Sequence, residues 1–238
     1  MPETKYRELY QLFKEKITTK QWPANSKIPD EISLCEQYGC SRMTMKKALD
    51  LLVDDGILYR KKGQGSFVMN ISNRKNALTI NERSLEGLTR ASKGHATSKI
   101  LEFRYIFADK KTAEILNIKK DDPVYEIIRL RYIDNVPHVI EKTYMAPSTI
   151  PGITINVLNG SVYEYIEIKL GLRIASAQKT VRADISNETD QKELHLKPNE
   201  PVLEVEQIAY LDNGTPFEYS FSRHRYDMFE FTSFSLRR

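Results

Sequence analysis

The chain has 238 residues, 40% of them hydrophobic and 29% charged, with 36 Lys+Arg against 32 Asp+Glu and a net charge of +4. This composition is that of a folded globular protein with one large or two modest domains, and it excludes disordered and fibrous proteins. No apolar run approaches the ~18 residues of a membrane span and the N-terminus is polar, so we expect no membrane segment and no signal peptide. Only two cysteines, Cys35 and Cys40, are present, so we expect buried structural thiols in a reducing cytoplasm rather than a disulfide framework.

The positive charge is concentrated in the first third of the chain. Residues 1–76 hold 14 Lys+Arg against 9 Asp+Glu, whereas the remaining residues hold 22 against 23. A basic module joined to a larger, nearly neutral one is typical of a polyanion-binding domain attached to a domain with another task.

Three helices are predicted in the basic third. Tyr6, Leu9, Tyr10, Phe13 and Ile17 follow helical spacing and predict an amphipathic helix over about residues 4–20. A second helix follows the N-cap Asp30 and ends at Gly39, and a third begins after the N-cap Ser41 and ends at Gly56. The third carries apolar residues on one face and basic ones on the other.

Two short strands, Ile57–Arg60 and Ser66–Met69, are predicted around a basic, glycine-rich turn at residues 61–65. Three helices and a basic hairpin predict a winged helix-turn-helix, whose third helix enters the major groove of DNA. A guanidinium at the start of that helix suits the two acceptors of guanine, and a glycine-rich wing lets backbone approach the sugar-phosphate chain. The candidate DNA-binding residues are Ser41, Arg42, Thr44, Lys46, Lys47, Lys62, Gly63, Gln64 and Gly65. Met43 suits core packing and contact with a thymine methyl equally well.

The segments Ile28-Pro29-Asp30-Glu31, residues 40–49, Leu52, Gly56-Ile57-Leu58 and residues 63–68 together resemble the GntR family of bacterial transcription regulators. The resemblance implies that Arg42 and Thr44 read the operator, that Ser41 supports them and that Gly63 enters the minor groove. Many relatives carry Arg or Lys where this chain has Ile32, so that DNA contact is not expected here.

A domain boundary is predicted at residues 70–77, which are polar and lack periodicity, so we expect a DNA-binding domain over 1–69, a linker over 70–77 and a second domain over 78–238. The second domain contains an internal repeat with an offset of 78 residues. The pattern Leu116-x-Ile118-Lys119 … Pro123-Val124-x-Glu126 … Tyr132-x-Asp134-Asn135 recurs from Leu194 to Asn213. Each copy predicts a short helix and a hairpin, so the domain is expected to be α+β around an antiparallel sheet, with a further helix from about Ser161 to Leu170.

The two copies of the repeat differ at a pair of positions that could serve a function. The first strand places Arg129 and Arg131 on one face, roughly 7 Å apart, whereas the second copy has Gln207 and Ala209 there. The fold therefore does not require the arginines. If the hairpin turns at residues 134–136, Glu141 comes opposite Arg129.

Asn159-Gly160-Ser161 opens a helix whose free N–H groups and hydroxyl could accept an anion beside this strand pair. Two guanidiniums, a helix start and a carboxylate fit a ligand with an anionic end and a hydroxyl end. An exposed Arg–Glu ladder on an ordinary sheet face is the equally weighted alternative.

Residues 79–238 resemble the UTRA domain of the HutC subgroup through Arg129-Leu130-Arg131, Pro137 with Glu141, residues 160–163 and Pro216-Phe217-Glu218. The resemblance implies a chorismate lyase-like fold without lyase activity. It also implies an effector pocket like that of the sugar-phosphate-responsive members. The matching residues that would line it here are Arg129, Arg131, Glu141, Ser161, Tyr163 and Glu218. One residue and one loop depart from the family pattern. His224 stands where a Tyr is usual, and the loop that often holds a phosphate is replaced by Arg83-Ser84-Leu85-Glu86-Gly87. His224 is kept as a candidate effector residue.

Catalytic and metal-binding patterns are not found in the sequence. The four histidines are scattered, and no nucleophile elbow or phosphate-binding loop is present, so no metal, cofactor or enzymatic activity is expected. We expect a homodimeric repressor of a carbohydrate operon that binds a palindromic double-stranded operator and is relieved by a small effector, a sugar phosphate. A small-molecule lyase tethered to nucleic acid and a non-specific architectural DNA binder are the alternatives.

Overall fold

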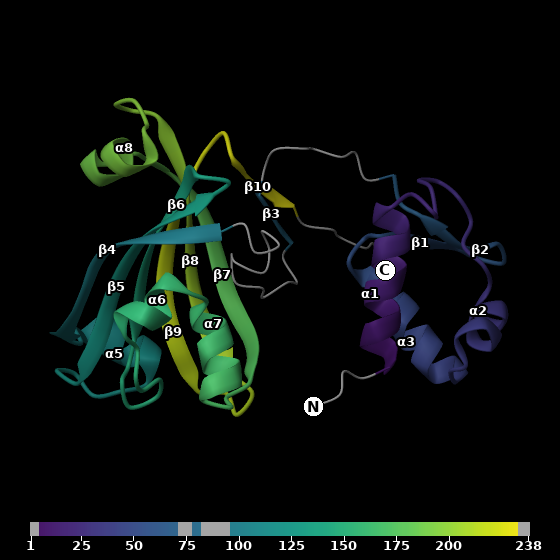
Figure 1. The fold of residues 1–238 in the computed structure, drawn as a ribbon, viewed down its shortest axis with the longest axis horizontal. Coiled ribbons are helices and arrows are strands. Elements are labelled where there is room, and N and C mark those ends of the chain that lie inside the picture. The colour runs from purple at the N-terminus through teal and green to yellow at the C-terminus, as the bar shows by residue number, and fades with distance from the viewer. Residues whose placement is uncertain (1–4, 71–77, 82–95, 233–238) are drawn as a thin grey trace. The chain divides into compact units, whose positions relative to one another are not determined.

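The computed structural model describes residues 5–70, 78–81 and 96–232, which fall into two compact units, one formed by residues 5–70 and one that includes residues 96–231 (Figure 1). The predicted linker, apart from Asn70, and the Arg83–Gly87 segment lie outside the described residues.

The first unit is built on three helices, α1 (Lys5–Thr18), α2 (Glu31–Tyr38) and α3 (Arg42–Asp54). The predicted caps are confirmed. Asp30 accepts hydrogen bonds from two backbone N–H groups of α2, Gly39 ends α2 in the left-handed conformation, and Ser41 accepts from the N–H of Thr44. The apolar faces meet in one core that includes Phe13, Leu34, Met45 and Leu52. Burial of these faces holds the three helices together.

The wing follows as the hairpin of β1 (Leu58–Lys61) and β2 (Gly65–Val68), which pair antiparallel with Lys61 opposite Gly65. The first strand begins one residue later than the sequence predicts, because the N–H of Ile57 still bonds the carbonyl of Leu52 at the end of α3. The second begins and ends one residue earlier, because Gly65 adopts a φ of 104° and joins the ladder. The winged helix-turn-helix itself is confirmed.

The second unit is built on a six-stranded antiparallel sheet in the order β4-β5-β6-β9-β8-β7. The strands are β4 (Ala96–Phe107), β5 (Pro123–Ile133), β6 (Val136–Met145), β7 (Ile174–Ile185), β8 (Pro201–Leu211) and β9 (Pro216–Arg225). A separate two-stranded sheet pairs β3 (Leu78–Asn81) with β10 (Phe229–Thr232). This arrangement confirms the predicted α+β class.

The internal repeat is longer than the sequence pattern indicates. Each copy comprises a long strand, a short helix and a hairpin: β4, α5 (Lys110–Leu116), β5 and β6 in the first, and β7, α8 (Glu188–Leu194), β8 and β9 in the second. The two copies meet at β6 and β9, so the strand order reads outward from the centre in the same sense on both sides. Both short helices are capped alike, by Asp109 and Asn187 at their N-termini.

Three short helical segments cover one face of the sheet, namely α6 (Ile155–Asn159), α7 (Val162–Glu164) and the π-helical turn η1 (Tyr165–Lys169) (Figure 1). Their apolar side chains form a core with Tyr125, Ile127 and Phe217 of the sheet. The single helix predicted from Ser161 to Leu170 is therefore wrong in detail. The N–H of Leu170 bonds the carbonyl of Tyr165, and this wider turn leaves Ile166 buried while Ile168 faces outward.

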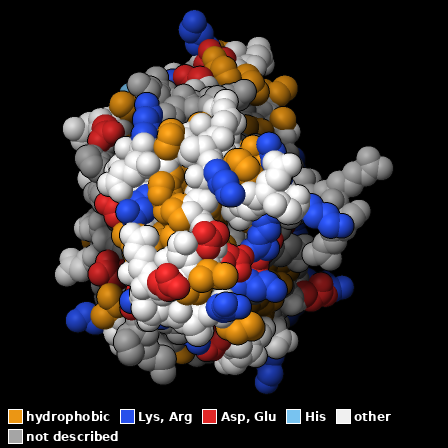
Figure 2. All heavy atoms as spheres, turned by 90° about the vertical axis from the view of Figure 1, so that its right-hand side faces the viewer, with side chains coloured by type: hydrophobic (Ala, Val, Ile, Leu, Met, Phe, Trp, Pro, Cys, Tyr) orange, Lys and Arg blue, Asp and Glu red, His pale blue; other side chains and the backbone are white. Residues whose placement is uncertain are grey.

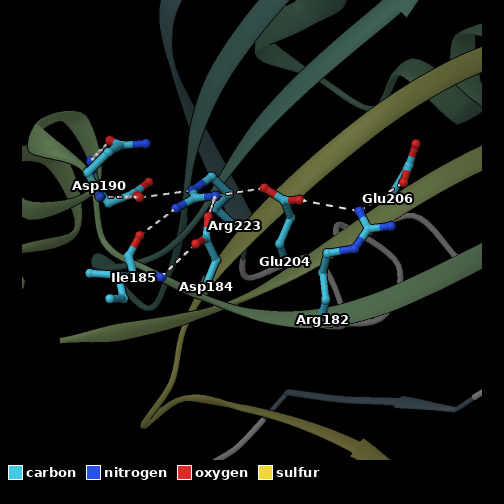
Figure 3. A network of polar contacts seen from close by, with 8 residues as sticks. Arg182, Asp184, Ile185, Asp190, Glu204, Glu206 and Arg223 are labelled. Atoms are coloured by element: carbon cyan, nitrogen blue, oxygen red, sulfur yellow. Dashed lines mark hydrogen bonds and ion pairs between the residues drawn. The ribbon is translucent and has the colours of Figure 1, made fainter. Parts of the chain in front are cut away.

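On the opposite face, α5 and α8 cover the two ends of the sheet with separate apolar clusters. Between these ends β8 carries Glu204 and Glu206, and an ion-pair network extends from Arg182 through Glu204 to Arg223 and on to Asp184 and Asp190 (Figure 3). Burial alone would lower the pKa of Arg223, but its hydrogen bonds to these carboxylates outweigh burial and raise it. This face is occupied by structural ion pairs. The candidate effector residues on the sheet lie on the other face, which α6, α7 and η1 cover.

Candidate functional site

The N-terminal turn of α3 presents the first group of candidate residues. The hydroxyl of Ser41 accepts from the N–H of Thr44 and lies 2.9 Å from the Thr44 hydroxyl, so the two side chains form one capping pair. Arg42 and Lys46 are exposed beside this pair. Their charges and the helix N-terminus together make this turn suitable for phosphate and base-edge contacts.

Two further side chains on α3 are placed differently. The ammonium group of Lys47 lies 4.1 Å from the centre of the Tyr6 ring on α1, so this lysine packs across to the first helix. Met43, which the sequence left between core and surface, is 76% exposed. The core packing of Met43 is therefore excluded, and its thioether lies on the same exposed turn as Arg42.

The wing tip presents the remaining basic candidates, with Lys62, Gly63 and Gln64 all exposed. Gly63 has a φ of 73° and no atom within 4 Å of an added Cβ, so only its backbone conformation favours glycine. At Gly65 the φ of 104° favours glycine in the same way, and an added Cβ would come 2.9 Å from Cε of Lys27, the end of a flexible side chain that can move aside.

A cleft of about 500 Å³ lies between the wing and the start of α2. Arg60 spans it, with 2.6 Å to Asp50 on α3 and 3.5 Å to Glu31 on α2, and so ties the wing to both helices. Figure 2 views the side on which β2 and α2 lie in Figure 1 and shows carboxylates among the lysines and arginines there. Ile32 is exposed on α2 and adds no charge to this surface.

The second group of candidates lies on the sheet face covered by α6, α7 and η1. Arg129 and Glu141 are directly opposite, as predicted, although the turn is shorter than the predicted 134–136 and is made by Asp134 and Asn135 with φ values of 49° and 64°. A β-bulge between Arg131 and Tyr132 shifts the register by one residue and so brings Glu141 opposite Arg129. The oxygen Oε2 of Glu141 lies 2.9 Å from Nη2 of Arg129 and 3.3 Å from Nη1 of Arg131. One carboxylate therefore holds both guanidiniums.

These arginines are not an exposed ladder. Arg129 is 8% and Arg131 3% exposed, and Arg129 also donates to the carbonyl of Leu158 in α6. Burial lowers the pKa of Arg129, against the influence of Glu141. Burial would raise the pKa of Glu141, but Arg131 and Arg129 outweigh it and lower that pKa. Two buried guanidiniums therefore share the Glu141 carboxylate, and the charge of Glu218 also acts on Arg129.

Glu218 forms the centre of a second polar cluster on the same face. Its Oε1 accepts from the amide of Gln207 at 2.9 Å and from the hydroxyl of Ser220 at 2.7 Å, and Gln207 also donates to the hydroxyl of Tyr163 at 3.1 Å. Burial raises the pKa of Glu218 and raises that of Tyr163 well above its ordinary value. This cluster is rich in groups that hydrogen-bond hydroxyls.

Lys179 on β7 completes this face. It pairs with Gln207 in the β7–β8 register, so both side chains lie on the same side of the sheet. Burial lowers the pKa of Lys179, and the nearby Glu218 opposes that shift. We refer to the side chains on this face as the polar layer: Arg129, Arg131, Glu141, Tyr163, Lys179, Gln207, Glu218, Ser220 and His224.

His224 lies opposite Val139 at the arginine end of the polar layer and is 4% exposed. Its ring stacks on Phe229 with a centroid separation of 3.9 Å, and its Nε2 has no hydrogen-bond partner within the described residues. Burial lowers its pKa to about 3, so the imidazole is neutral at physiological pH. A buried, neutral donor or acceptor is thus left facing the layer near Glu141.

Ser161 is placed differently from the other candidates. Its hydroxyl caps the three-residue helix α7 by accepting from the N–H of Glu164 at 3.2 Å. The cap uses the hydroxyl that the sequence offers to an anion, so the role of Ser161 as an effector ligand stays a prediction.

Lys179 and Ser220 were missed by the sequence, and Gln207 was noted only as the residue that replaces an arginine. The offset of the repeat could have found Gln207, because it lies at the position of Arg129 in the second copy. Lys179 gives no such signal, since its place depends on the pairing of β7 with β8 across α8.

Within residues 5–70, 78–81 and 96–232, no group of three or more His, Cys, Asp or Glu side chains could hold a metal ion. In the same part of the chain no helix is long and apolar enough to cross a membrane.

Comparison with known proteins assigns both units. Residues 5–68 match the family described as "Bacterial regulatory proteins, gntR family", and residues 91–230 match the family described as "UTRA domain". The chain is 41% identical over 235 residues to the HTH-type transcriptional regulator GmuR of Bacillus subtilis, covering 98% of this chain and 99% of that protein. It is 30% identical to the probable fructoselysine utilization operon transcriptional repressor of Escherichia coli K12, covering 90% and 88% of the two chains. The crystal structure of the possible transcriptional regulator YydK from Bacillus subtilis superposes with a TM-score of 0.82 at 28% identity, covering 98% of this chain and all of that one.

Proposed function

This chain belongs to the GntR family of bacterial transcription regulators, with a UTRA domain of the HutC type, and we propose that it represses carbohydrate-uptake or catabolism genes until a phosphorylated sugar binds its second domain. The family consists of DNA-binding regulators and not of enzymes, which sets aside a lyase activity. The probable fructoselysine utilization operon transcriptional repressor supports a carbohydrate role and repression by analogy alone.

DNA recognition is assigned to the start of α3 and to the wing tip. Arg42 lies exposed next to the capped turn of Ser41 and Thr44, where a guanidinium can enter the major groove as the helix docks. The sugar-phosphate chain is contacted by the cations Lys46 and Lys62 and by the wing-tip residues Gly63, Gln64 and Gly65. Lys47 is expected to contribute less to DNA binding than its place on the basic face of α3 suggests, because its ammonium group packs over Tyr6.

The observation that carries the effector assignment is the polar layer. It joins two buried guanidiniums that share one carboxylate to a cluster of hydroxyl-binding groups around Glu218. A phosphate monoester would accept charge-assisted hydrogen bonds from the guanidiniums of Arg129 and Arg131, and the hydroxyls of a sugar ring would bond Glu141, Glu218, Tyr163 and His224. Ser161 is a weaker candidate, because its hydroxyl caps α7.

Repression and relief follow from linkage between the two domains. We infer a homodimer that presents two winged helices to a palindromic operator, with half-sites spaced by the dimer. A sugar phosphate relieves repression only if it binds more tightly to an arrangement of the domains that does not match the operator.

A thermal-shift screen tests the effector assignment. Hexose, hexosamine and disaccharide phosphates are compared with the unphosphorylated sugars, on the wild-type protein and on Arg129→Ala. A ligand that binds the native state raises Tm by mass action, so a phosphate-dependent shift that the variant loses supports the assignment. If no phosphate produces a shift that depends on Arg129, the sugar-phosphate assignment is wrong and organic acids or amines become the class to test.

A further inference from the structure

The polar layer extends further across the sheet than one sugar phosphate bound to the arginines requires. Arg129 lies on β5 and Lys179 on β7, with β6, β9 and β8 between them. Four strand-to-strand steps of about 4.8 Å give roughly 19 Å between the two backbone positions before the side chains lean inward.

Glu218 lies between the two cationic ends of the layer. Its charge acts on Arg129 on one side and on Lys179 on the other. Gln207 separates Lys179 from the rest of the cluster, because it bonds both Glu218 and Tyr163 while pairing with Lys179 in the ladder. A phosphate on the arginines and one ring on Glu141, Glu218 and Tyr163 therefore leave Lys179 beyond the ring.

The position of Lys179 on the sheet also matters. β7 is the edge strand of the six-stranded sheet, and Lys179 is half-buried on the face of the layer rather than fully enclosed. A ligand that continues past Gln207 would meet an ammonium group at the edge of the sheet, beyond which no strand of the described residues pairs with β7.

We propose that Lys179, together with Gln207, forms a distal subsite that binds the second ring of a phosphorylated disaccharide, and that this subsite sets the preference for a disaccharide phosphate over a monosaccharide phosphate. The inference rests on the proposed function, because it takes the arginine pair as the phosphate anchor. The ammonium group donates hydrogen bonds to hydroxyl and ring oxygens of the second sugar, and no covalent step is involved.

A structural role offers a different account of the same residue. Lys179 could serve only as a counter-ion that makes the burial of Glu218 less costly. The two roles differ in what they predict for ligands of different length, because a counter-ion affects all ligands that touch Glu218 alike.

The test compares three probes that share one phosphorylated glucose ring: glucose 6-phosphate, and the disaccharides cellobiose 6′-phosphate and trehalose 6-phosphate, in which a second glucose is attached at C1 of that ring. Dissociation constants are measured by calorimetry on the full chain for wild type, Lys179→Met, Lys179→Gln and Arg129→Ala. Lys192→Met serves as the matched control, since Lys192 is highly exposed on α8.

We expect Lys179→Met to weaken at least one disaccharide phosphate by about tenfold or more, the loss of one hydrogen bond from a charged group, and to change glucose 6-phosphate by less than about twofold. Lys179→Gln keeps a donor and should fall between wild type and the methionine variant. Arg129→Ala should weaken all three probes, and Lys192→Met none.

The inference is overturned if wild type binds glucose 6-phosphate as tightly as both disaccharide phosphates, or if Lys179→Met weakens long and short probes equally or not at all. Those results would leave the sugar-phosphate function intact. A failure of wild type to bind any of the three in an Arg129-dependent way would instead refute the phosphate anchor, and the distal subsite with it.

Discussion

Glu141 is a buried carboxylate that contacts two buried guanidiniums, so its replacement by Gln should destabilise the second domain severely. The variant keeps the shape of the side chain and one acceptor oxygen, but it removes the negative charge that Arg129 and Arg131 share. Both guanidiniums are largely buried, with side-chain exposures of 10% and 4%, and Glu141 approaches them at 2.9 and 3.3 Å. Removing one partner of a buried ion pair costs roughly 3–5 kcal/mol, because the remaining charge stays buried and uncompensated.

The magnitude can be converted into a melting temperature. For a domain of this size each kcal/mol shifts Tm by about 2–4 °C, so Glu141→Gln should lower the transition by roughly 6–20 °C. The assay is scanning calorimetry of the full chain, with Trp fluorescence recorded in parallel. Trp22 is the only tryptophan and packs against Phe13 in the first unit. Its fluorescence therefore reports the unfolding of the first unit, which does not contain Glu141. The transition that Trp22 reports should stay in place.

A matched control separates burial from ion pairing as such. Glu102 also pairs with an arginine, Arg104, at 2.9 Å, but the two side chains are 37% and 56% exposed. Glu102→Gln should therefore cost less than about 1 kcal/mol. If Glu141→Gln lowers the free energy of unfolding no more than Glu102→Gln does, the arginine pair is better hydrated than its burial indicates. The argument that the variant leaves buried charges uncompensated would then be wrong. Added phosphate should in turn raise the Tm of Glu141→Gln more than that of wild type.

Further predictions concern DNA, pH and the wing. Arg42→Ala should weaken operator binding by roughly 1–3 kcal/mol and relax preference at one base position per half-site, measured by anisotropy titrations against operator variants; unchanged selectivity would reduce Arg42 to a phosphate contact. His224 is buried neutral with a pKa of about 3, below its unfolded value, so it contributes stability above about pH 6.5 that is lost as pH falls toward 3. His224→Phe, which keeps the stack on Phe229, should flatten the acid side of the stability–pH curve between these values, and an unaltered slope would show that His224 is hydrated. Gly65→Ala should lower both stability and DNA affinity, because a φ of 104° strains any L side chain, while the end of Lys27 can move away from the added Cβ; a wild-type urea midpoint would contradict this.

The sequence predicts those parts of the fold that local chemistry determines. Asp30, Gly39 and Ser41 are capping residues whose effect is limited to one helix turn, so the boundaries of α2 and the start of α3 follow from them. The position of Glu141 opposite Arg129 is predicted from a turn over residues 134–136, whereas the structure reaches the same register through a two-residue turn at Asp134 and Asn135 and a β-bulge between Arg131 and Tyr132. The 78-residue repeat extends this reasoning to a second hairpin.

The parts that sequence reasoning missed depend on contacts between distant segments. The segment from Ser161 to Leu170 has the apolar spacing of one helix, yet packing of Ile166 into the core widens its second turn into η1. Lys179 reaches the polar layer only because β7 pairs with β8 after the excursion through α8, and the alternation within β7 does not reveal this. The burial of Arg129 and Arg131 likewise depends on α6 folding over the sheet, as the bond from Arg129 to the Leu158 carbonyl illustrates.

The most direct test of the account is whether a phosphorylated sugar releases operator DNA through the arginine pair. DNA selected by the purified protein from a random pool is labelled, bound to the wild-type protein and to Arg129→Ala, and titrated with sugar phosphates while anisotropy is recorded. The account predicts that both proteins bind the selected DNA, that a sugar phosphate releases it from wild type and that the variant retains it at the same concentration. Release from both proteins alike, or no release by any phosphate that binds the wild-type protein, would contradict the claim that the polar layer controls DNA binding.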